Sequence, residues 1–343
     1  MPPELRNPRI SVIIPFFQRQ AGVLRRAATS VMAQQFAKPA DVELLVVDDA
    51  SPVRAAADLA GLSPPPWLTI RIIEQANAGP AAARNRGLDA MRPDADFIAF
   101  LDSDDEWRPR HLATGVQALE RGQDFYFCDS AMPPSTLFAG LDLFRTPLDR
   151  RPFEPIGDDL HRFAGRSAAL PMLREYLCQT SSVILRAAAL GELRFDEGLR
   201  HAGEDWLMWV RLAHRVDGVC FSIRANSLRG EGINLYRDAH DRLTGANLRR
   251  IVTMIRANQL MAQTPGLARE GKDLVRARIR TLEIEAAAIM MHPALYRACK
   301  DAQQRRIVLG AWRRMGAVMP LRWPAVLLRR LGSPAPRSRA QPA

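Results

Sequence analysis

The sequence predicts an α/β protein with a mostly parallel sheet, helices on both faces of that sheet, and an α-helical C-terminal extension. Three observations support this fold class. Short apolar runs rich in β-branched residues alternate with segments whose apolar residues recur at helical spacing. Several of these runs are nearly continuous, as in strands that are buried on both faces. Beyond about residue 240, only helical patterns are found.

The first part of the chain alternates strand and helix. We expect strands at residues 10–15, 43–48, 70–74, 96–101 and 124–128. The expected helices lie at 22–35, 53–61, 80–91 and 109–121. In parallel sheets, ligands bind outside the carboxyl ends of the strands. Pro15, Asp49 and the acidic residues after Leu101 all fall at such ends, so the pattern predicts one shared binding site.

The later part of the chain is less regular. Prolines interrupt residues 130–176, which we expect to form an irregular insertion on the acceptor side with at most short helices. The further elements expected are a strand at 181–185, a helix at 203–215, a strand at 219–223, and helices at 241–262, 266–290 and 294–316. The predicted regions are a main domain over 1–235, an α-helical region over 236–331 and a disordered tail over 332–343.

The charge of the chain is unevenly distributed. The net charge is +11, yet residues 241–343 hold 20 basic and 6 acidic residues, whereas residues 1–240 hold 28 and 31. The basic region also lacks the stacking aromatics and glycine-rich runs of most single-strand binders. We therefore expect no nucleic-acid partner.

Cysteine usage and hydropathy bear on the cellular location. The four cysteines are widely spaced without a C-x-x-C pair, which supports neither a zinc site nor a disulfide framework and favours a reducing compartment. The first residues have no apolar core of an export signal, and no run reaches about 18 apolar residues. We expect a cytoplasmic protein without a membrane span.

The most informative stretch is DFIAFLDSDDEW, from Asp96 to Trp107. An apolar strand ends against Asp102, Asp104 and Asp105, whose carboxylates repel one another unless a cation is near. Oxygen ligands at a rigid strand end suit Mg²⁺ or Mn²⁺, which bind few carboxylates and keep other positions for substrate phosphates. The alternative is an acidic loop before the helix that Pro109 opens.

Six segments, taken in order, resemble the family 2 glycosyltransferases of the GT-A fold. They are SVIIPFFQR, ELLVVDDAS, NAGPAAARNRGL, FIAFLDSDDEW, SSVIL and RFDEGLRHAGEDWLMWVRLA. The resemblance covers residues 9–225 and implies an inverting enzyme with a nucleoside-diphosphate sugar, UDP-sugar by preference, as donor. It further implies transfer to a hydroxyl of a saccharide or lipid-linked acceptor in cell-surface polysaccharide synthesis.

The resemblance assigns the donor site residue by residue. It places Pro15 and Phe16 against the nucleoside and Asp49 at the base. Arg84 is implied near the base or the diphosphate. Gly79 is implied where the backbone approaches the ligand closely, although turn formation alone also explains a glycine there.

The acidic motif receives its roles in the same way. Asp104 is implied near the ribose or the metal ion, Asp105 at the metal ion, and Asp102 in support of both. Because Asp102 and Asp104 form the D-x-D pair that describes this fold, the metal-binding pair is assigned to within one residue. Trp107 is expected to pack beneath the site.

The resemblance also implies the residues that act on the acceptor. Asp205 corresponds to the catalytic base of the inverting members, and Glu204 to a neighbour that orients the acceptor. Seen alone, both acids are explained by the attraction of carboxylates to a helix N-terminus. The implied chemistry needs a divalent ion at the leaving diphosphate and a base at the acceptor hydroxyl. Trp206 and Trp209 line a sugar or pack in the core.

Other classes of protein fit the sequence less well. A sugar nucleotidyltransferase should carry a glycine-rich phosphate loop after the first strand, and PFFQRQAG has a single glycine. A membrane-embedded polymer synthase should show spans and a Gln-x-x-Arg-Trp motif, whereas here Met319 precedes Arg322 and Trp323. A non-catalytic module that binds nucleotides or nucleic acid is the alternative from a different class.

Residues 300–331 combine arginine, aliphatic residues and tryptophan. This composition favours a segment that lies on an anionic membrane surface, which would place the protein peripherally on the cytoplasmic face of the inner membrane. A helix that packs back on the body is the alternative.

Deletion of residues 300–343 tests these two interpretations. A membrane-binding segment predicts that the shortened protein keeps nucleotide binding but sediments less with anionic liposomes at low salt, because each Lys or Arg near such a surface contributes about 1 kcal/mol. Liposomes of neutral lipid are the control. Unchanged sedimentation would support packing on the body.

Overall fold

A computed structural model describes residues 6–147, 151–157, 159–230 and 244–290. Within them the strands form one sheet of eleven, and nine of these follow the order β3-β2-β1-β4-β10-β6-β11-β9-β8. The strands are β1 (Arg9–Phe16), β2 (Asp41–Asp48), β3 (Leu68–Glu74), β4 (Phe97–Phe100), β5 (Glu106–Trp107), β6 (Phe125–Met132), β7 (Ser135–Thr136), β8 (Phe153–Pro155), β9 (Leu160–Phe163), β10 (Ile184–Arg186) and β11 (Val219–Leu228).

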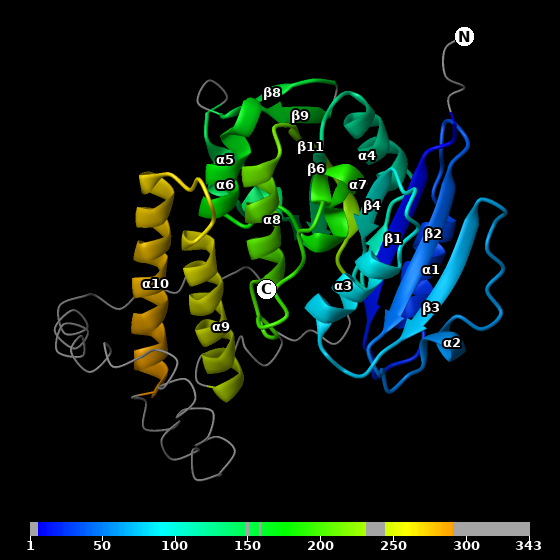
Figure 1. Ribbon diagram of the computed structural model, residues 1–343, viewed down its shortest axis with the longest axis horizontal. Helices are drawn as coiled ribbons and strands as arrows, with labels where there is room; N and C mark the ends of the chain where they lie inside the picture. Colours follow the sequence, from blue (N-terminus) through cyan, green and yellow to red (C-terminus); the bar gives the residue numbers. More distant parts are fainter. Residues whose placement is uncertain (1–5, 148–150, 158, 231–243, 291–343) are drawn as a thin grey trace.

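Helices cover both faces of this sheet (Figure 1). They are α1 (Val23–Met32), α2 (Ala55–Asp58), α3 (Pro80–Ala90), α4 (His111–Glu120), α5 (Asp142–Arg145), α6 (Ala169–Arg174), α7 (Ala187–Leu190), α8 (Glu204–Arg215), α9 (Gly245–Ala262) and α10 (Arg269–Met290). Short 3₁₀ turns occur at Phe138–Gly140, Gly165–Ala168 and Thr180–Ser182.

The pairing of the strands confirms the predicted mostly parallel sheet. Strands β3, β2, β1 and β4 are mutually parallel, and β6 is parallel to β11. Strand β10 lies between these two blocks and runs antiparallel to both β4 and β6. The two parallel blocks therefore meet at β10, close to the end of β4 where the acidic motif begins.

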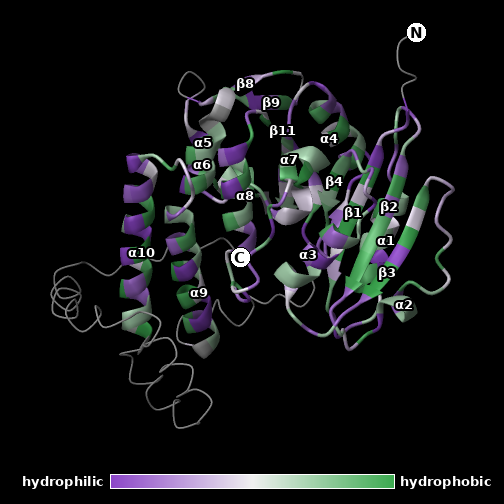
Figure 2. Ribbon diagram, viewed as in Figure 1, coloured by the Kyte–Doolittle hydropathy of each residue, from purple (hydrophilic) through white to green (hydrophobic). Residues whose placement is uncertain are grey.

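Alternation along the central strands explains why helices are needed on both faces. Both β1 and β2 are buried over nearly their whole length. Successive residues belong to different core clusters, with Ile13 and Leu45 on the face of α3 and α8, and Val12 on the face of α1 and α4. Figure 2 shows the matching hydrophobic colouring of these strands. Continuous apolar runs therefore indicated two-sided burial correctly.

Residues 130–176 are more ordered than the sequence predicts. Besides short helices, they contain the antiparallel pair β8–β9, and β9 extends the sheet by pairing with β11. Aromatic rings pack this pair against β11. Phe153 lies edge-on to Phe221 with ring centroids 4.9 Å apart, and His161 stacks on Phe221 with centroids 5.3 Å apart. Strands of three and four residues are too short for a period-2 pattern, which is why the sequence did not predict them.

Several strand boundaries differ from prediction, and two of these differences concern loops near the end of β4. The strand expected at 181–185 begins only at Ile184, because Thr180–Ser182 form a 3₁₀ turn. Strand β11 continues past residue 223 to Leu228 through two irregular steps in its register with β6, and its last residues pair with β5. Both differences bring polar loops to the carboxyl end of β4.

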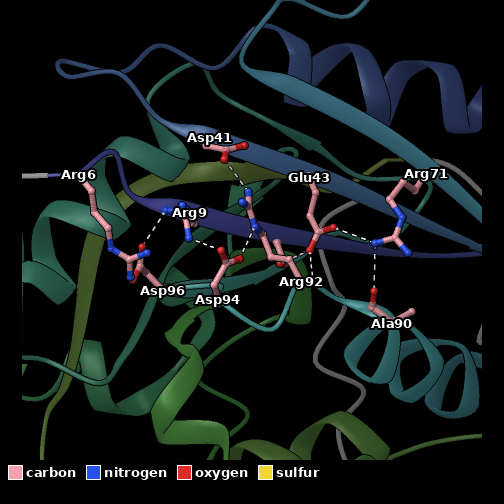
Figure 3. A network of polar contacts seen from close by, with 10 residues as sticks. Arg6, Arg9, Asp41, Glu43, Arg71, Ala90, Arg92, Asp94 and Asp96 are labelled. Carbon is pink, nitrogen blue, oxygen red and sulfur yellow. Dashed lines mark hydrogen bonds and ion pairs between the residues drawn. The ribbon is translucent and has the colours of Figure 1, made fainter.

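The opposite end of the sheet carries a separate network of charges (Figure 3). Ion pairs join Arg9 to Asp94 and Arg92 to Asp41 near the start of the parallel strands. The buried Glu43 accepts hydrogen bonds from Ser11 Oγ at 2.6 Å and from the backbone N–H of Arg92 at 2.6 Å. Ion pairs that are partly exposed in this way contribute little free energy.

The predicted helices at 241–262 and 266–290 are present as α9 and α10, which stand beside α8 on the side of the molecule away from β3 (Figure 1). In the described part of the chain, no helix combines the length and hydropathy needed to cross a membrane. The helix predicted at 294–316, the membrane segment at 300–331 and the tail at 332–343 lie outside the described residues.

Among the described residues, Trp209 is the largest fully buried side chain. It lies in the core between the sheet and α8, so replacing it measures how much this core contributes to stability. The distance from its ring centroid to that of Phe100 is 5.6 Å, to that of Phe125 5.8 Å and to that of Phe195 5.5 Å. We expect Trp209→Ala to lower the free energy of unfolding in urea by about 3–5 kcal/mol. The control, Ile223→Ala on the exposed part of β11, should change it by no more than about 0.5 kcal/mol.

Candidate active site

The acidic motif is fixed at the carboxyl end of β4 by Asp105, whose side chain is buried. Asp105 Oδ2 accepts hydrogen bonds from Gln179 Nε2 at 2.8 Å and Ser181 Oγ at 2.5 Å, and Oδ1 accepts one from the backbone N–H of Gly230 at 2.9 Å. A Cβ at Gly230 would lie 1.5 Å from the Asp104 carbonyl oxygen, so only glycine fits there. Asp105 thus connects its own loop to residues 179–181 and to the loop at Gly230.

Ser181 links the neighbouring residues to this anchor. Its Oγ accepts a hydrogen bond from the backbone N–H of Asp102 at 3.0 Å while donating to Asp105. The indole Nε1–H of Trp107 donates to the Ser181 carbonyl at 2.6 Å. Trp107 is buried, which agrees with the prediction that it packs beneath the site.

The three aspartates form an electrostatically strained group. Burial, reinforced by the negative charge of Asp102, raises the pKa of Asp104 from 3.8 to about 6. Burial and the charges of Asp102 and Asp104 likewise raise the pKa of Asp105. Each shift means that the charged form is disfavoured, which a bound cation would correct.

Arg84 neutralises only one side of this group. Its Nη2 lies 2.7 Å from Asp102 Oδ1 and its Nη1 lies 3.2 Å from Glu204 Oε1. The guanidinium group is almost completely buried and stands 5.3 Å from the ring centroid of Phe195. Arg84 therefore ties α3 to the end of β4 and to the start of α8, which places the acidic motif and the GED motif in one site.

Glu204 and Asp205 have different surroundings although they are adjacent. Glu204 is buried, and its pKa is raised by burial and by the charge of Asp205, against the opposing effect of Arg84. Asp205 is partly buried, and its Oδ2 accepts a hydrogen bond from the Tyr176 hydroxyl and one from Thr180 Oγ1 at 3.4 Å. Its Oδ1 accepts from the backbone N–H of Trp206 at 2.7 Å. Asp205 is the more accessible of the two carboxylates.

Asp49 shapes the loop before α3. Its carboxylate accepts hydrogen bonds from Gln75 Nε2 at 2.7 Å and from the backbone N–H groups of Ala78 at 2.7 Å and Gly79 at 2.9 Å. The next residue, Ala50, has φ 54°, a left-handed conformation that is rare outside glycine. Such strain is often found at binding sites.

The end of β1 meets both parts of the site. Pro15 and Phe16 are buried, and the Phe16 ring lies in the core cluster beside α1. The Phe16 carbonyl accepts a hydrogen bond from the Asp49 N–H at 2.9 Å. Gln18 Nε2 donates to Ser103 Oγ at 3.1 Å, which links this loop to the acidic motif.

Trp206 and Trp209, which were expected to line a sugar or to pack in the core, both make packing contacts. Trp209 belongs to the core, and Trp206 donates its Nε1–H to the Met172 carbonyl at 2.6 Å while one ring face carries Arg278. In these contacts, both side chains stabilise the fold.

Sequence reasoning did not assign functional roles to several residues that donate hydrogen bonds to the site. They are Tyr176, Gln179, Thr180, Ser181 and Gly230. The available signal was the polar run Gln-Thr-Ser-Ser directly before an apolar strand, since polar residues at a strand end often line a site. Tyr176 carries no such signal, because its approach to Asp205 depends on how residues 130–176 fold.

The donor set fits a divalent ion held mainly by substrate. Both carboxylate oxygens of Asp105 are already used by protein donors, whereas no hydrogen bond from another described residue reaches the Asp104 carboxylate. Within the described ranges, no three His, Cys, Asp or Glu side chains converge as a complete metal cage. One or two carboxylates that leave positions for phosphate oxygens are the usual arrangement for Mg²⁺.

The fold and site together define a class of protein. A mixed, mostly parallel sheet of GT-A type presents an acidic cluster at one strand end and a carboxylate pair at the start of a facing helix. The model of the family described as "Glycosyl transferase family 2" matches residues 11–139. The succinoglycan biosynthesis protein ExoW of Rhizobium meliloti (strain 1021) is 33% identical over 237 residues, covering 66% of this chain and 70% of that protein. The chain belongs to glycosyltransferase family 2.

Solved structures agree on the fold. S. aureus TarS 1-349 in complex with UDP-GlcNAc has a TM-score of 0.56 at 16% identity, covering 88% of this chain and 79% of that one. The mannosyltransferase PcManGT from Pyrobaculum calidifontis, in complex with GDP-Man and Mn²⁺, has a TM-score of 0.52 at 16% identity, covering 95% and 88%. At these identities, the comparison bears on the fold alone.

The pKa of Asp104 predicts how Mn²⁺ binding depends on pH. A carboxyl whose pKa is raised from 3.8 to about 6 contributes stability below about pH 4 that is lost as the pH rises through 6. Mn²⁺ must displace the proton at pH 5 but not at pH 8. We therefore expect a fixed Mn²⁺ concentration, in the presence of UDP, to raise the unfolding temperature more at pH 8.

Two variants identify the ligand in this experiment. Asp104→Asn should abolish the effect of Mn²⁺ if Asp104 binds the ion. Asp105→Asn should lower the starting stability while part of the Mn²⁺ effect is kept, because Asp105 anchors loops. Equal Mn²⁺ effects at both pH values, or no change in Asp104→Asn, would argue against metal binding by Asp104.

Proposed function

We propose that this family 2 enzyme transfers a sugar, with inversion, from a UDP-sugar to a hydroxyl of a saccharide or lipid-linked acceptor in cell-surface polysaccharide synthesis. The donor is proposed to bind with Mn²⁺ or Mg²⁺ at the carboxyl ends of β1, β2 and β4. The acceptor is proposed to approach Asp205 from the side of residues 130–176.

The observation that carries this proposal is the position of residues 179–181. Gln179 and Ser181 donate hydrogen bonds to Asp105, while Thr180 between them reaches Asp205 at 3.4 Å. Three successive side chains thus connect the acidic motif to the candidate base. A bound diphosphate at the first and a hydroxyl at the second would lie within one site, as in-line displacement requires.

The residues present support a defined division of roles. When bound, a divalent ion would supply charge stabilisation for the leaving diphosphate, with Asp104 and Asp102 as its protein ligands. Asp205 would accept the proton of the acceptor hydroxyl as that oxygen attacks the anomeric carbon and the bond from this carbon to the diphosphate oxygen breaks. Glu204, held by Arg84, would orient the acceptor, and Asp49 would fix the loop that receives the base.

The choice of substrates draws on the relatives. UDP-GlcNAc is bound in the TarS structure, and GDP-Man with Mn²⁺ is bound in PcManGT, which supports a nucleoside-diphosphate sugar here. The name of ExoW supports a role in the synthesis of an extracellular polysaccharide. A cytoplasmic enzyme, peripheral on the inner membrane through residues 300–331, would meet such donors and lipid-linked acceptors.

A non-catalytic nucleotide-binding module is the competing proposal. It shares the donor site but has no need of a base, so the two proposals differ at Asp205. The donor is first identified by a screen of nucleotide sugars with and without Mn²⁺, read as the rise in unfolding temperature and then as UDP release.

Asp205→Asn removes the proton acceptor while keeping the shape of the side chain. We expect donor affinity within twofold of the native value and a fall in kcat of about 10²–10⁴-fold, which corresponds to about 3–5 kcal/mol of activation free energy. Glu204→Gln should have a smaller effect. Native turnover in Asp205→Asn with a saccharide acceptor would refute the base, and a product with retained anomeric configuration would refute inversion.

A further inference from the structure

Helix α10 lies outside the segment that matches the family model, yet one of its side chains reaches the surroundings of Asp205. The Arg278 guanidinium stands 4.3 Å from the ring centroid of Trp206. Its Nη2 donates to the carbonyls of Leu173 and Arg174, each at 2.8 Å, and its Nη1 donates to Asn258 Oδ1 at 3.2 Å. The planar fork and the stacked face both match arginine rather than lysine.

Through these contacts, Arg278 fixes the end of α6. Carbonyls in the last turn of a helix have no partner within the helix. Here those of Leu173 and Arg174 are satisfied by Arg278, and that of Met172 is satisfied by Trp206 Nε1 at 2.6 Å. Arg278 and the indole stacked on it therefore bind three successive carbonyls and hold the chain that leads directly to Tyr176.

The two residues so positioned contact opposite oxygens of Asp205. Tyr176 donates its hydroxyl to Oδ2, and the backbone N–H of Trp206 donates to Oδ1 at 2.7 Å. The Tyr176 ring also lies edge-on to Trp206 at 6.2 Å. A displacement of the indole or of the α6 end would therefore disturb two of the three groups that orient the carboxylate, the third being Thr180.

Helix α9 contacts both the start of α8 and Arg278. Gly203, with φ 82°, precedes Glu204, and a Cβ at this position would lie 2.9 Å from Ala257 Cβ and 3.1 Å from Met254 Sδ. Asn258 of the same helix accepts the hydrogen bond from Arg278. The start of α8 is thus packed closely against α9, which stands between α8 and α10 (Figure 1).

We propose that Arg278 is a positioning residue for the catalytic base, acting through Trp206 and Tyr176 on Asp205. Helices α9 and α10 are accordingly part of the catalytic unit. This inference rests on the proposed function, because it takes Asp205 as the base. A purely structural clamp would affect unfolding but not the ratio of turnover to donor binding.

The first test compares Arg278→Ala and Arg278→Lys with Arg276→Ala. Arg276 is exposed two residues earlier on the same helix and pairs with Asp273 at 3.0 Å, so it is a matched control. UDP affinity is measured by calorimetry, and turnover by UDP release from the donor identified in the nucleotide-sugar screen. We expect Arg278→Ala to keep UDP affinity within twofold and to lower kcat about tenfold or more, because small misplacements of a catalytic group are costly.

The conservative variant gives a graded result. Arg278→Lys keeps a cation over the indole but cannot bridge the α6 carbonyls and Asn258 together, so its kcat should fall between those of the native enzyme and Arg278→Ala. Arg276→Ala should match the native enzyme. Equal kcat in Arg276→Ala and both Arg278 variants would overturn the inference, and Arg278→Lys alone decides it if Arg278→Ala does not fold.

A double variant separates this inference from the proposed function. If Arg278 acts through Asp205, adding Arg278→Ala to Asp205→Asn should cause no further loss of donor hydrolysis. An equal loss in both backgrounds would overturn the inference. Native activity in Asp205→Asn would instead refute the base itself.

A crystal structure of the Arg278→Lys variant gives a readout that needs no substrate. We expect the Trp206 indole or the end of α6 to shift and the contact between Tyr176 and Asp205 to lengthen. If both remain as in the native protein, Arg278 does not position Asp205.

Discussion

The buried guanidinium of Arg84, shared between Asp102 and Glu204, is the interaction on which the site depends. Its distances of 2.7 and 3.2 Å to the two carboxylates join α3, the end of β4 and the start of α8. A buried charge is tolerated only when it is paired, and removing one partner of such a pair typically costs about 3–5 kcal/mol. This requirement forces three segments that are far apart in sequence to meet at one edge of the sheet.

One arginine cannot neutralise all the carboxylates gathered there. Asp105 is accommodated by three hydrogen bonds from two other loops, whereas the Asp104 carboxylate receives none from another described residue and has a pKa raised to about 6. An excess of this kind is a liability for folding but an advantage for holding a divalent ion with a diphosphate.

The candidate base is supported differently, by neutral donors and packed aromatic rings. Tyr176, Thr180 and the Trp206 backbone surround Asp205, and the indole of Trp206 is in turn held by α6 and α10. Neutral donors orient a carboxylate without adding a fixed positive charge beside it, which suits a group that must accept a proton. The acidic motif and the candidate base thus have largely separate supports, which are connected by Arg84 and by residues 179–181.

The sequence by itself determined the alternation of strands and helices, the two-sided burial of β1 and β2, and the strand end at which Asp102, Asp104 and Asp105 gather. These features depend on local periodicity, which the order of residues records directly. Only the tertiary structure decided that the Phe16 ring faces the core, that Asp105 anchors loops, and that Tyr176 and Arg278 stand behind Asp205. Each of these depends on contacts between segments tens to more than a hundred residues apart, and no spacing pattern along the chain records which distant side chain will complete a buried hydrogen bond.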